Sequence, residues 1–457
     1  MMSLTQAAQV LNARLQGSDV SFSGVSTDTR TLESGDLFVA LRGERFDGHA
    51  FLGTARDKGA AAALVDTRAQ AAAAPLPMLV VDDTRLALGR LAASWRARFA
   101  MPLVALTGSS GKTTVKEMLA SILRAAADEN AGAVLATRGN LNNDIGVPLM
   151  LLELREHHRY AVIEMGMNHA GEIRYLTELA EPDVALVTNA GRAHIEFLGS
   201  EEAIARAKGE IFETLPAGGT AVINADDAYA PLWRGMARKR RCIDFGLERP
   251  ANVTATFRRA ARHSEVEIST PSGTAHVKLE APGAHNVRNA LAAAAAAVAL
   301  EIPLTALAAG LERYGGVKGR LQMKSAAGGA ALIDDTYNAN PESMRAAIDV
   351  LAESAGEKVL VIGDMGELGT RGPALHAELG VYARRAGIDR MLAVGELTQE
   401  TVKAFGAGAR HFPNIDGLLA ALRGSLAPEA TVLVKGSRFM KMERVVAALE
   451  SGAPACS

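Results

Sequence analysis

Short apolar runs alternate with amphipathic helical patterns along most of this 457-residue chain. Runs at 101–107, 160–165, 184–188 and 220–224 are each followed by a stretch with helical periodicity. Runs that are apolar throughout, rather than at every second position, are typical of strands buried on both faces. Strands that alternate with helices in this way predict a mostly parallel sheet covered by helices.

The same alternation returns after Tyr314-Gly315-Gly316, which has the composition of a linker. The runs ALIDD, KVLVIGDM, RMLAVGE and TVLVKGS each precede a helical stretch, which predicts a Rossmann-like unit. Near the N-terminus, Leu37–Leu41, Ala61–Val65 and Met78–Val81 are short runs among turns and indicate a small α+β unit. At about 150 residues per domain, the length also favours three domains. We therefore predict an α/β protein with domains at 1–100, 101–316 and 317–457.

Composition and charge argue against a nucleic-acid-binding protein, a disulfide-rich protein and a cysteine-based zinc site. The chain has 48% hydrophobic and 22% charged residues, which is an ordinary globular balance. Its 49 Lys and Arg against 51 Asp and Glu give a net charge of -2, so no overall positive field attracts nucleic acid. Cys242 and Cys456 match neither a disulfide framework nor a zinc-binding spacing, which fits a reducing cytoplasm.

The sequence also predicts a protein outside the membrane. Gln6 and Asn12 stand where a signal peptide needs its apolar centre, and no stretch approaches about 18 uninterrupted apolar residues. No coiled-coil pattern or long exposed apolar stripe is evident, so we expect a monomer. We therefore expect a cytoplasmic protein with neither a membrane nor a nucleic-acid partner.

The strongest local signal is the segment Thr107–Thr114, TGSSGKTT, between an apolar run and a helical pattern. Its glycines let the backbone wrap a phosphate, Lys112 can reach the β- and γ-phosphates, and the Thr113 hydroxyl can bind Mg²⁺. The common phosphate-loop pattern would have glycine at position 106, where this chain has Leu106. The segment predicts an ATP site in the central domain, and a simple turn with a surface lysine is the alternative.

Two polar residues follow apolar runs of the central domain. Glu164 closes the run YAVIE, and His194 lies in NAGRAHIEFLGS, just after VALVT. Ligands bind at the carboxyl ends of parallel strands, and a Mg-nucleotide needs oxygen or nitrogen ligands there. Both residues are candidate metal ligands, although such a glutamate often only meets solvent and a lone histidine is often structural.

Lys208 lies within the apolar face of a predicted helix. Ser200 is a suitable N-cap for the segment SEEAIARAKGEIFETL, and its apolar positions include Ile204, Ile211 and Phe212. At about 100° per residue, Lys208 points between Ile211 and Phe212, toward the buried side. A lysine there must extend its amine to solvent, pair with an acid, or be chemically altered.

Two clusters of polar residues interrupt apolar surroundings. The segment ATRGNLNNDIGVP contains Thr137, Asn140, Asn142 and Asn143, which suit a sugar or amide substrate, although asparagine-rich turns also form for backbone reasons. The segment IDDTYNANPESM places polar side chains on a loop after a strand, before a helix with Pro341 in its first turn. The density of polar groups there favours a binding site; they are Asp334, Asp335, Tyr337, Asn338 and Asn340.

These segments together resemble the ATP-dependent Mur ligases. TGSSGKTT resembles the phosphate loop of that family, which tolerates the missing glycine at 106. Seven more segments follow in the family's order: TRGNLNNDIGVP, EMGMNHAGEI, NAGRAHIEFLGS, AKGEIF, GAHNVRNALAA, KGRLQ and DDTYNANPES. The NANPES form is similar to that of members that add D-alanyl-D-alanine, whereas members that add diaminopimelate or lysine would show a DNPR-type motif.

The resemblance implies three domains, which bind a uridine nucleotide, bind ATP, and close over the site. It also implies that two Mg²⁺ ions are held by Thr113, Glu164, His194 and a carbamylated Lys208. ATP would contact Gly108, Ser109, Ser110, Gly111, Lys112, Thr113, Thr114, Asn286, Asn289, Arg320, Asp335 and Tyr337. The uridine diphosphate would contact Thr27, Asp28, Thr29, Arg30, Arg42 and Asp47. The acceptor would contact Asn338, Asn340, Lys435, Ser437 and Arg438.

The implied substrates are UDP-N-acetylmuramoyl-tripeptide and D-alanyl-D-alanine, joined through an acyl phosphate in peptidoglycan precursor synthesis. Lys112, Glu164, His194, Lys208 and Arg320 would carry the catalysis. The alternatives are a folylpolyglutamate synthase, a P-loop ATPase that switches conformation, and an ATP-binding regulatory module. A separate N-terminal nucleotide-binding domain argues against the first. ATP hydrolysis without co-substrates would favour the second, and a regulatory module would not need Glu164, His194 and Lys208 together.

Overall fold

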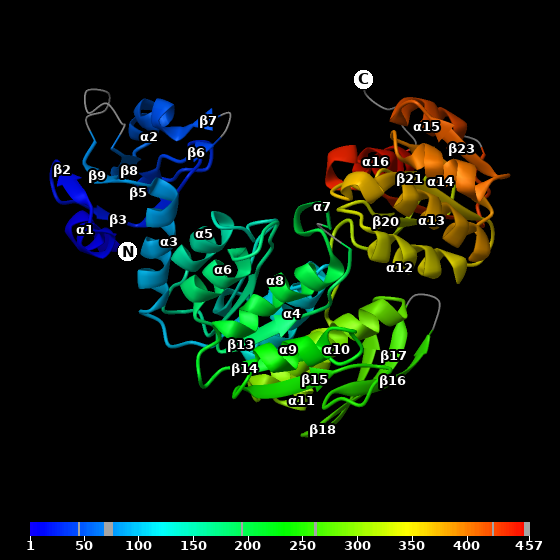
Figure 1. Cartoon of the computed structure of the whole chain (residues 1–457), viewed down its shortest axis with the longest axis horizontal. Coiled ribbons are helices and arrows are strands. Elements are labelled where there is room, and N and C mark those ends of the chain that lie inside the picture. The colour runs from blue at the N-terminus through cyan, green and yellow to red at the C-terminus, as the bar shows by residue number, and fades with distance from the viewer. Residues whose placement is uncertain (44–45, 68–75, 193–194, 260–262, 423–424, 452–457) are drawn as a thin grey trace.

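The computed structural model describes residues 1–43, 46–67, 76–192, 195–259, 263–422 and 425–451. Three units, each built around a sheet, follow one another along the chain, which confirms the predicted α/β architecture. The central unit lies between the N-terminal and C-terminal units (Figure 1). Within the described residues, no helix is both long and apolar enough to cross a membrane.

The N-terminal unit contains a five-stranded sheet in the order β2-β9-β8-β5-β4. All neighbours are parallel except β2 and β9. The strands of this sheet are β2 (Arg14–Gln16), β4 (Gly24–Ser26), β5 (Asp36–Val39), β8 (Ala62–Asp66) and β9 (Met78–Val81). The other elements are β1 (Met2–Ser3), β3 (Ser21–Phe22), β6 (Arg42–Gly43), β7 (Phe46–Asp47), η1 (Gly48–Phe51), α1 (Leu4–Leu11), α2 (Leu52–Asp57) and α3 (Thr84–Arg96).

The central unit contains a six-stranded sheet, entirely parallel, in the order β11-β12-β10-β13-β14-β15. These strands are β10 (Leu103–Thr107), β11 (Val134–Ala136), β12 (Tyr160–Glu164), β13 (Val184–Val187), β14 (Thr220–Asn224) and β15 (Arg241–Phe245). Its helices are α4 (Lys112–Ala126), η2 (Ala131–Ala133), α5 (Gly146–Leu152), α6 (Glu172–Ala180), α7 (Ile195–Leu198), α8 (Glu201–Glu213), α9 (Ala230–Met236), α10 (Ala284–Ala299) and α11 (Leu304–Glu312).

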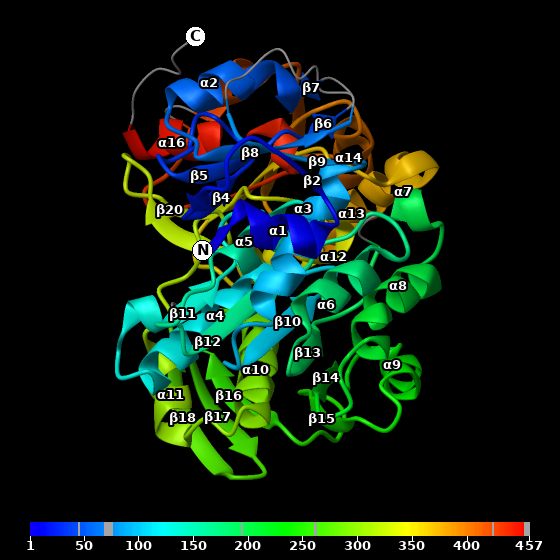
Figure 2. The same ribbon diagram turned by 90° about the vertical axis from the view of Figure 1, so that its left-hand side faces the viewer.

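An antiparallel sheet of three strands interrupts this α/β pattern. Its strands, β16 (Thr254–Arg259), β17 (Ser264–Thr270) and β18 (Gly273–Leu279), pair in sequence order. On β17 the buried Val266 and Ile268 alternate with exposed residues, as in a sheet with one face toward solvent. The prediction of helices and parallel strands alone did not include this sheet. Figure 2 places it at the lower end of the molecule, beside α10 and α11.

The C-terminal unit has a six-stranded sheet in the order β19-β20-β24-β21-β22-β23, parallel except for β19 at one edge. Its strands are β19 (Gln322–Ser325), β20 (Ala331–Asp335), β21 (Lys358–Gly363), β22 (Arg390–Val394), β23 (Ala409–Phe412) and β24 (Thr431–Lys435). Its helices are α12 (Pro341–Ala352), η3 (Gly369–Arg371), α13 (Gly372–Arg385), α14 (Thr398–Phe405), α15 (Ile415–Leu422), η4 (Arg438–Met440) and α16 (Glu443–Ser451).

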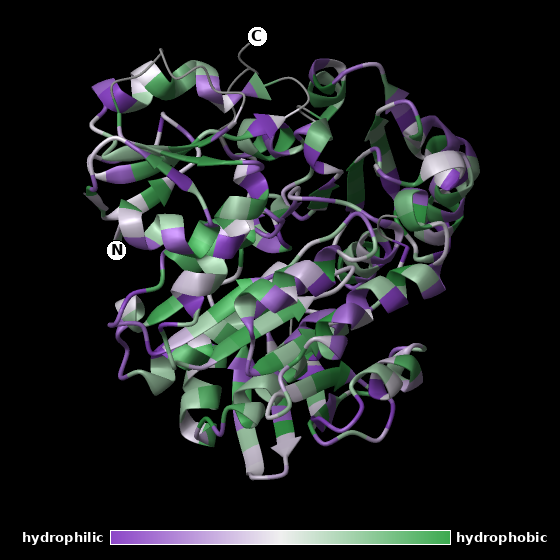
Figure 3. Cartoon of the chain, turned by 60° about the vertical axis from the view of Figure 1, so that its left-hand side comes forward, coloured by the Kyte–Doolittle hydropathy of each residue, from purple (hydrophilic) through white to green (hydrophobic). Residues whose placement is uncertain are grey.

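The hydrophobic cores show how firmly the units are joined. One core continues from the N-terminal unit into the central unit, where Leu88, Leu91 and Trp95 of α3 join residues of α5 and α6. The indole N–H of Trp95 also donates to the Leu154 carbonyl (3.1 Å). The C-terminal unit has separate cores on the two faces of its sheet, and Figure 3 shows apolar residues gathered along the strands. The first two units therefore share apolar packing, whereas polar contacts join the third unit at the site described below.

The contact between α11 and α4 gives a test of this packing. The Ser121 hydroxyl donates to the Gly310 carbonyl (2.6 Å), and a Cβ on Gly310 would overlap the backbone of Ser121 and Ile122. Gly310→Ala is expected to lower the free energy of unfolding by about 1–3 kcal/mol, because two helix backbones must separate. Gly235→Ala, in α9 with open space around it, is expected to raise that energy by about 0.5–1 kcal/mol. Urea denaturation of both variants measures the difference, and equal stabilities would contradict the close packing.

Candidate active site

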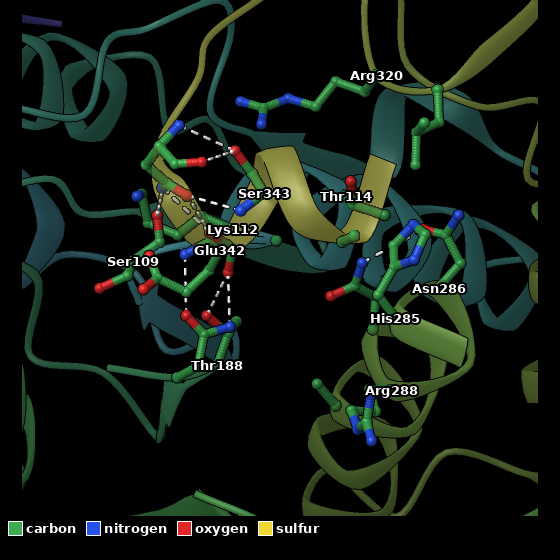
Figure 4. A pocket seen from close by; sticks show the side chains of 18 of the residues that line it. Ser109, Lys112, Thr114, Thr188, His285, Asn286, Arg288, Arg320, Glu342 and Ser343 are labelled. Atoms are coloured by element: carbon green, nitrogen blue, oxygen red, sulfur yellow. Dashed lines mark hydrogen bonds between the residues drawn. The ribbon is translucent and has the colours of Figure 1, made fainter. Parts of the chain in front are cut away.

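A cavity of about 370 Å³ lies between the central and C-terminal units. Its walls come from the loop between β10 and α4, from the first turns of α10, and from the segment that leads from Arg320 into α12. Figure 4 shows Lys112 and Ser109 on one side, Asn286 and Arg288 on another, and Arg320 above them. The cavity lies beyond the carboxyl end of β10, where parallel sheets bind their ligands.

The loop between β10 and α4 has the geometry that its sequence predicts. α4 begins at Lys112, and its N-cap residue Gly111 has a φ of 81°. Gly108 has a φ of 155°, and a side chain there would collide with the Thr188 hydroxyl. Both positions therefore require glycine. The first N–H groups of α4 have no partner within the helix and can bind a phosphate.

The end of the neighbouring strand β13 holds this loop in place. The Ser110 amide donates to Asn189 Oδ1 (2.9 Å), while Thr188 Oγ1 and Asn189 Nδ2 both donate to the Ser110 carbonyl (2.7 and 3.1 Å). Neither Thr188 nor Asn189 is among the residues that the sequence predicts for the site. Only their position could have indicated them from the sequence, because they directly follow β13, the strand beside β10 in the sheet.

Lys208 is buried, as its position on the predicted helix requires. Ser200 caps α8 by accepting a hydrogen bond from the Ala203 amide (3.1 Å), and Ile211 and Phe212 are fully buried. Lys208 is itself only 1% exposed, so its amine does not reach solvent. In the part of the chain that the structure describes, no acidic side chain pairs with it. Burial and the nearby Lys112 ammonium lower the pKa of Lys208 well below its usual value, which favours the neutral amine.

Glu164 ends β12 close to the phosphate loop. Its Oε1 accepts a hydrogen bond from Asn142 Nδ2 (2.9 Å), whereas its Oε2 is buried and has no hydrogen-bond partner among the described residues. A buried carboxylate oxygen without a partner is costly unless a ligand meets it. Burial lowers the pKa of Lys112, and the Glu164 carboxylate acts against this effect. Glu164 therefore fits a cation beside the phosphates, while His194 lies outside the described residues.

The polar segment at 137–143 makes hydrogen bonds within the protein. Thr137 Oγ1 accepts from the Glu164 amide (2.9 Å). Asn142 holds the Glu164 carboxylate, and Asn143 Oδ1 accepts from the amides of Ile145 and Gly146 at the start of α5. Asn140 is exposed. The structure thus places Thr137 and Asn142 around Glu164, a position that the sequence did not indicate.

The C-terminal unit contributes directly to the phosphate loop. Arg320 Nη2 donates to Thr113 Oγ1 (3.0 Å), and the Arg320 guanidinium lies 4.4 Å from the centre of the Tyr337 ring. Asn340 Nδ2 donates to Ser110 Oγ (3.2 Å) while the same side chain caps α12. Thr113, predicted to hold the metal, and Arg320, predicted to contact ATP, are therefore hydrogen-bonded to each other.

Among the other predicted residues of this unit, Lys435 contacts Asp335 and Asn338, whereas Ser437 and Arg438 have different partners. Lys435 Nζ lies 2.7 Å from Asp335 Oδ2 and donates to the Asn338 carbonyl (2.8 Å). Asp334 and Asp335 are the last residues of β20, so the expectation that they lie on the following loop is wrong; the strand pairing with β24 continues through them. Ser437 Oγ accepts from the Gly366 amide (2.8 Å). Arg438 pairs with Glu443 (3.1 Å) on the surface.

Asn286 and Asn289 lie on α10 at the opposite wall of the cavity. Asn286 Nδ2 donates to the Pro282 carbonyl (2.8 Å), and Asn289 Nδ2 donates to Asn286 Oδ1 (3.3 Å). This arrangement fixes both amides beside the phosphate loop. Asp335 also lines the cavity, whereas Tyr337 is not among its lining residues and instead contacts Arg320.

The residues predicted for the uridine diphosphate lie on the N-terminal unit, outside the lining of this cavity. Arg30 pairs with Asp28 (2.6 Å) in the turn after β4, and this hydrogen bonding lowers the pKa of Asp28 to about 2. Arg42 pairs with Asp47 and with the buried Asp66 (2.7 Å). Thr27 and Thr29 flank Asp28 in the same turn. The structure thus forms two groups within the N-terminal unit, one around Asp28 and one around Arg42.

One contact between the units was absent from the prediction. Arg192 Nε donates to Glu342 Oε1 (2.9 Å), and its Nη1 donates to Glu378 Oε2 (3.3 Å). The adjacent Gly191 exchanges hydrogen bonds with the Ser109 hydroxyl. Because Glu342 is in the first turn of α12, this contact connects the phosphate loop to the C-terminal unit. The sequence shows an arginine and a glutamate 150 residues apart, and no local pattern indicates that they meet.

Three family descriptions match successive parts of the chain: "Mur ligase family, catalytic domain" at 21–96, "Mur ligase middle domain" at 106–297 and "Mur ligase, glutamate ligase domain" at 319–438. The chain is 46% identical to UDP-N-acetylmuramoyl-tripeptide--D-alanyl-D-alanine ligase of Escherichia coli, with 98% of both chains covered. It is similar to the crystal structure of MurF from Acinetobacter baumannii, with 40% identity, a TM-score of 0.90 and 98% of both chains covered. MurF ligase from Thermotoga maritima in complex with ADP has 28% identity and a TM-score of 0.81, over 94% of this chain and 97% of that chain.

Proposed function

The chain belongs to the Mur ligase family, and from this premise we propose that it is an ATP-dependent ligase that joins D-alanyl-D-alanine to UDP-N-acetylmuramoyl-tripeptide. The products are UDP-N-acetylmuramoyl-pentapeptide, ADP and phosphate. The pentapeptide nucleotide is a precursor in peptidoglycan synthesis. The observation that carries the proposal is the similarity to the Escherichia coli ligase along 98% of both chains. The cavity at the phosphate loop, with walls from two units, supplies the geometry.

The reaction needs ATP because a carboxylate is a poor electrophile. An oxygen of the tripeptide's terminal carboxylate attacks the γ-phosphorus in line, the bond between the γ-phosphorus and the bridging oxygen breaks, and ADP leaves. Lys112, in the phosphate loop, and Arg320, beside it, stabilise the negative charge that develops on the transferring group. The product of this step is an acyl phosphate.

The amine of D-alanyl-D-alanine then attacks the acyl carbon. The bond from carbon to the phosphate oxygen breaks, phosphate leaves with the electron pair, and the amine nitrogen loses a proton as the amide forms. Asn338, Asn340, Lys435, Ser437 and Arg438 are proposed to orient the dipeptide. Contacts of Arg320 and Asn340 with the phosphate loop hold the C-terminal unit over the cavity, where it excludes the water that would hydrolyse the intermediate.

The residues around Glu164 fit Mg²⁺. Glu164 Oε2 is a buried oxygen without a partner in the described structure, and Thr113, His194 and Lys208 complete the proposed ligands. Bound Mg²⁺ would neutralise phosphate charge and orient the γ-phosphate. The neutral amine of Lys208 can attack the carbon of carbon dioxide and lose a proton, which gives an anionic carbamate and converts a costly buried amine into an oxygen ligand. We propose two Mg²⁺ ions and a carbamylated Lys208.

The three units are proposed to divide the substrates among them. Residues 1–100 would bind the uridine nucleotide through the groups at Asp28 and Arg42, residues 101–316 would bind ATP, and residues 317–457 would bind the acceptor. Each family match lies within one of these ranges. The N-terminal match also argues against a folylpolyglutamate synthase. We propose that the enzyme acts as a monomer in the cytoplasm, where ATP and the nucleotide precursor occur, with neither nucleic acid nor membrane as partner.

Phosphate release tests this proposal directly. The purified chain with Mg-ATP, UDP-N-acetylmuramoyl-tripeptide and D-alanyl-D-alanine is expected to release one phosphate for each new amide, with mass spectrometry to identify the pentapeptide product. Omission of either co-substrate should abolish amide formation. ATP hydrolysis that is unchanged by both co-substrates would reject the ligase and favour an ATPase that switches conformation.

A further inference from the structure

Lys116 is a buried lysine on α4, one helical turn after the half-buried Lys112. Its side chain is 2% exposed and lies outside the cavity lining. Nζ donates to the Thr137 carbonyl (2.5 Å) and is 2.9 Å from Glu117 Oε1. Removing a lysine ammonium from water costs free energy, so its hydrogen bond and ion pair must offset that cost. The proposed reaction uses neither Lys116 nor Glu117.

The contact with Lys116 changes the hydrogen bonding at the point where the pairing of β11 with β12 ends. The two strands are parallel, with Ala136 opposite Val162, and the Thr137 amide donates to the Val162 carbonyl (3.0 Å). In a regular parallel ladder the next hydrogen bond would run from the Glu164 amide to the Thr137 carbonyl. Here that carbonyl accepts from Lys116, and the Glu164 amide donates to the Thr137 hydroxyl (2.9 Å).

This exchange of acceptors places the carboxylate of Glu164. The ladder ends at Thr137, and the chain continues to Asn142, which returns to β12. Asn142 Nδ2 donates to Glu164 Oε1 (2.9 Å), and the Asn142 carbonyl accepts from the Gly166 amide (2.7 Å). The main chain and one carboxylate oxygen of Glu164 are therefore fixed, and Oε2 is left for a ligand.

We propose that Lys116 is a positioning residue for the magnesium site. Its hydrogen bond to Thr137 sets the end of the β11–β12 ladder and thereby the place of Glu164 Oε2. The affinity of the site for Mg²⁺ in the Mg-nucleotide then depends on a lysine that contacts neither the metal nor the nucleotide. This inference rests on the proposed function only in taking Mg-ATP as the ligand.

The test compares Lys116→Met with Glu117→Gln. Lys116→Met keeps an unbranched side chain, one atom shorter, and removes the hydrogen bond to Thr137. Glu117→Gln removes the charge of Glu117, and with it the ion pair, and retains that hydrogen bond. Calorimetry measures the binding of a non-hydrolysable ATP analogue with and without Mg²⁺. We expect Lys116→Met to reduce the gain in affinity from Mg²⁺ by about tenfold, with metal-free binding changed by less than about twofold. Glu117→Gln is expected to retain the wild-type gain.

A third variant keeps the test decisive if Lys116→Met fails to fold, as judged by circular dichroism. Thr137→Val removes the hydroxyl that accepts from the Glu164 amide and is expected to reduce the Mg²⁺ effect in the same direction. In the double variant the two reductions should be less than additive, because both act through one set of hydrogen bonds. An unchanged Mg²⁺ effect in the folded single variants, or an equal loss in Glu117→Gln, would overturn the positioning role. No Mg²⁺ effect in the wild-type protein would overturn it too. If the wild-type protein still ligates its substrates but Mg²⁺ does not change nucleotide binding, the positioning role fails while the proposed function stands.

Discussion

Lys208→Ala is expected to lower kcat by at least about a thousandfold, because a charged ligand of the metal would be lost at the transferring phosphoryl group. The structure supports this size of effect. Lys208 is 1% exposed and lies close enough to Lys112 for that ammonium to help lower its pKa. A neutral amine with no acidic partner among the described residues has little structural use there, whereas its carbamate would give the site an anionic oxygen. Steady-state phosphate release with all substrates measures the loss.

Chemical rescue separates the carbamate from a lysine that only packs. Small carboxylates such as acetate can occupy the space left by Lys208→Ala and are expected to restore part of the activity, while they leave the wild-type enzyme unchanged. Lys278→Ala, which removes an exposed lysine of β18, is the matched control and should retain full activity. Labelled bicarbonate should give a carbamate signal by NMR in the wild-type protein and none in Lys208→Ala. A fully active Lys208→Ala enzyme would sink the carbamate proposal.

Features that depend on local periodicity could be predicted from the sequence. The apolar positions around Lys208 fix which side of α8 is buried, and the structure confirms both the Ser200 cap and the burial of the lysine. The glycines of the phosphate loop predict a tight turn between a strand and a helix, and Gly108 and Gly111 both have positive φ values. In these cases a few neighbouring residues determine the conformation.

Features that depend on distant residues could not be predicted in this way. The pairing of Arg192 with Glu342 depends on how the C-terminal unit meets the central one. The side chains of Thr137 and Asn142 suggest a polar substrate when taken alone, yet in the fold they hold Glu164. The antiparallel sheet of β16–β18 was missed because an assignment of alternating strands and helices leaves no place for consecutive hairpins.

Arg320→Ala is expected to reduce kcat by about 10³–10⁵-fold, with a much smaller change in the KM for ATP, because an arginine of this kind acts mainly on the transition state. Arg320 Nη2 already contacts Thr113 at the start of α4, and the Tyr337 ring supports the guanidinium. Arg320 Nε is buried without a hydrogen-bond partner in the described structure, so the guanidinium retains an N–H donor for a ligand. The charge therefore lies beside the phosphate loop before the nucleotide binds.

Arg320→Lys tests whether charge alone is enough. Lysine keeps the positive charge but loses the planar fork and the contact with Tyr337, so we expect most of the loss in kcat to remain. Arg313→Ala, at an exposed arginine that pairs with Glu129 on the surface, provides the control and should keep wild-type kinetics. Because the Arg320 guanidinium lies beside the phosphate loop, where the γ-phosphate is transferred, its removal should slow acyl phosphate formation itself. Single-turnover phosphate transfer from labelled ATP measures that step, and an unchanged rate in Arg320→Ala would show that the arginine only joins the two units.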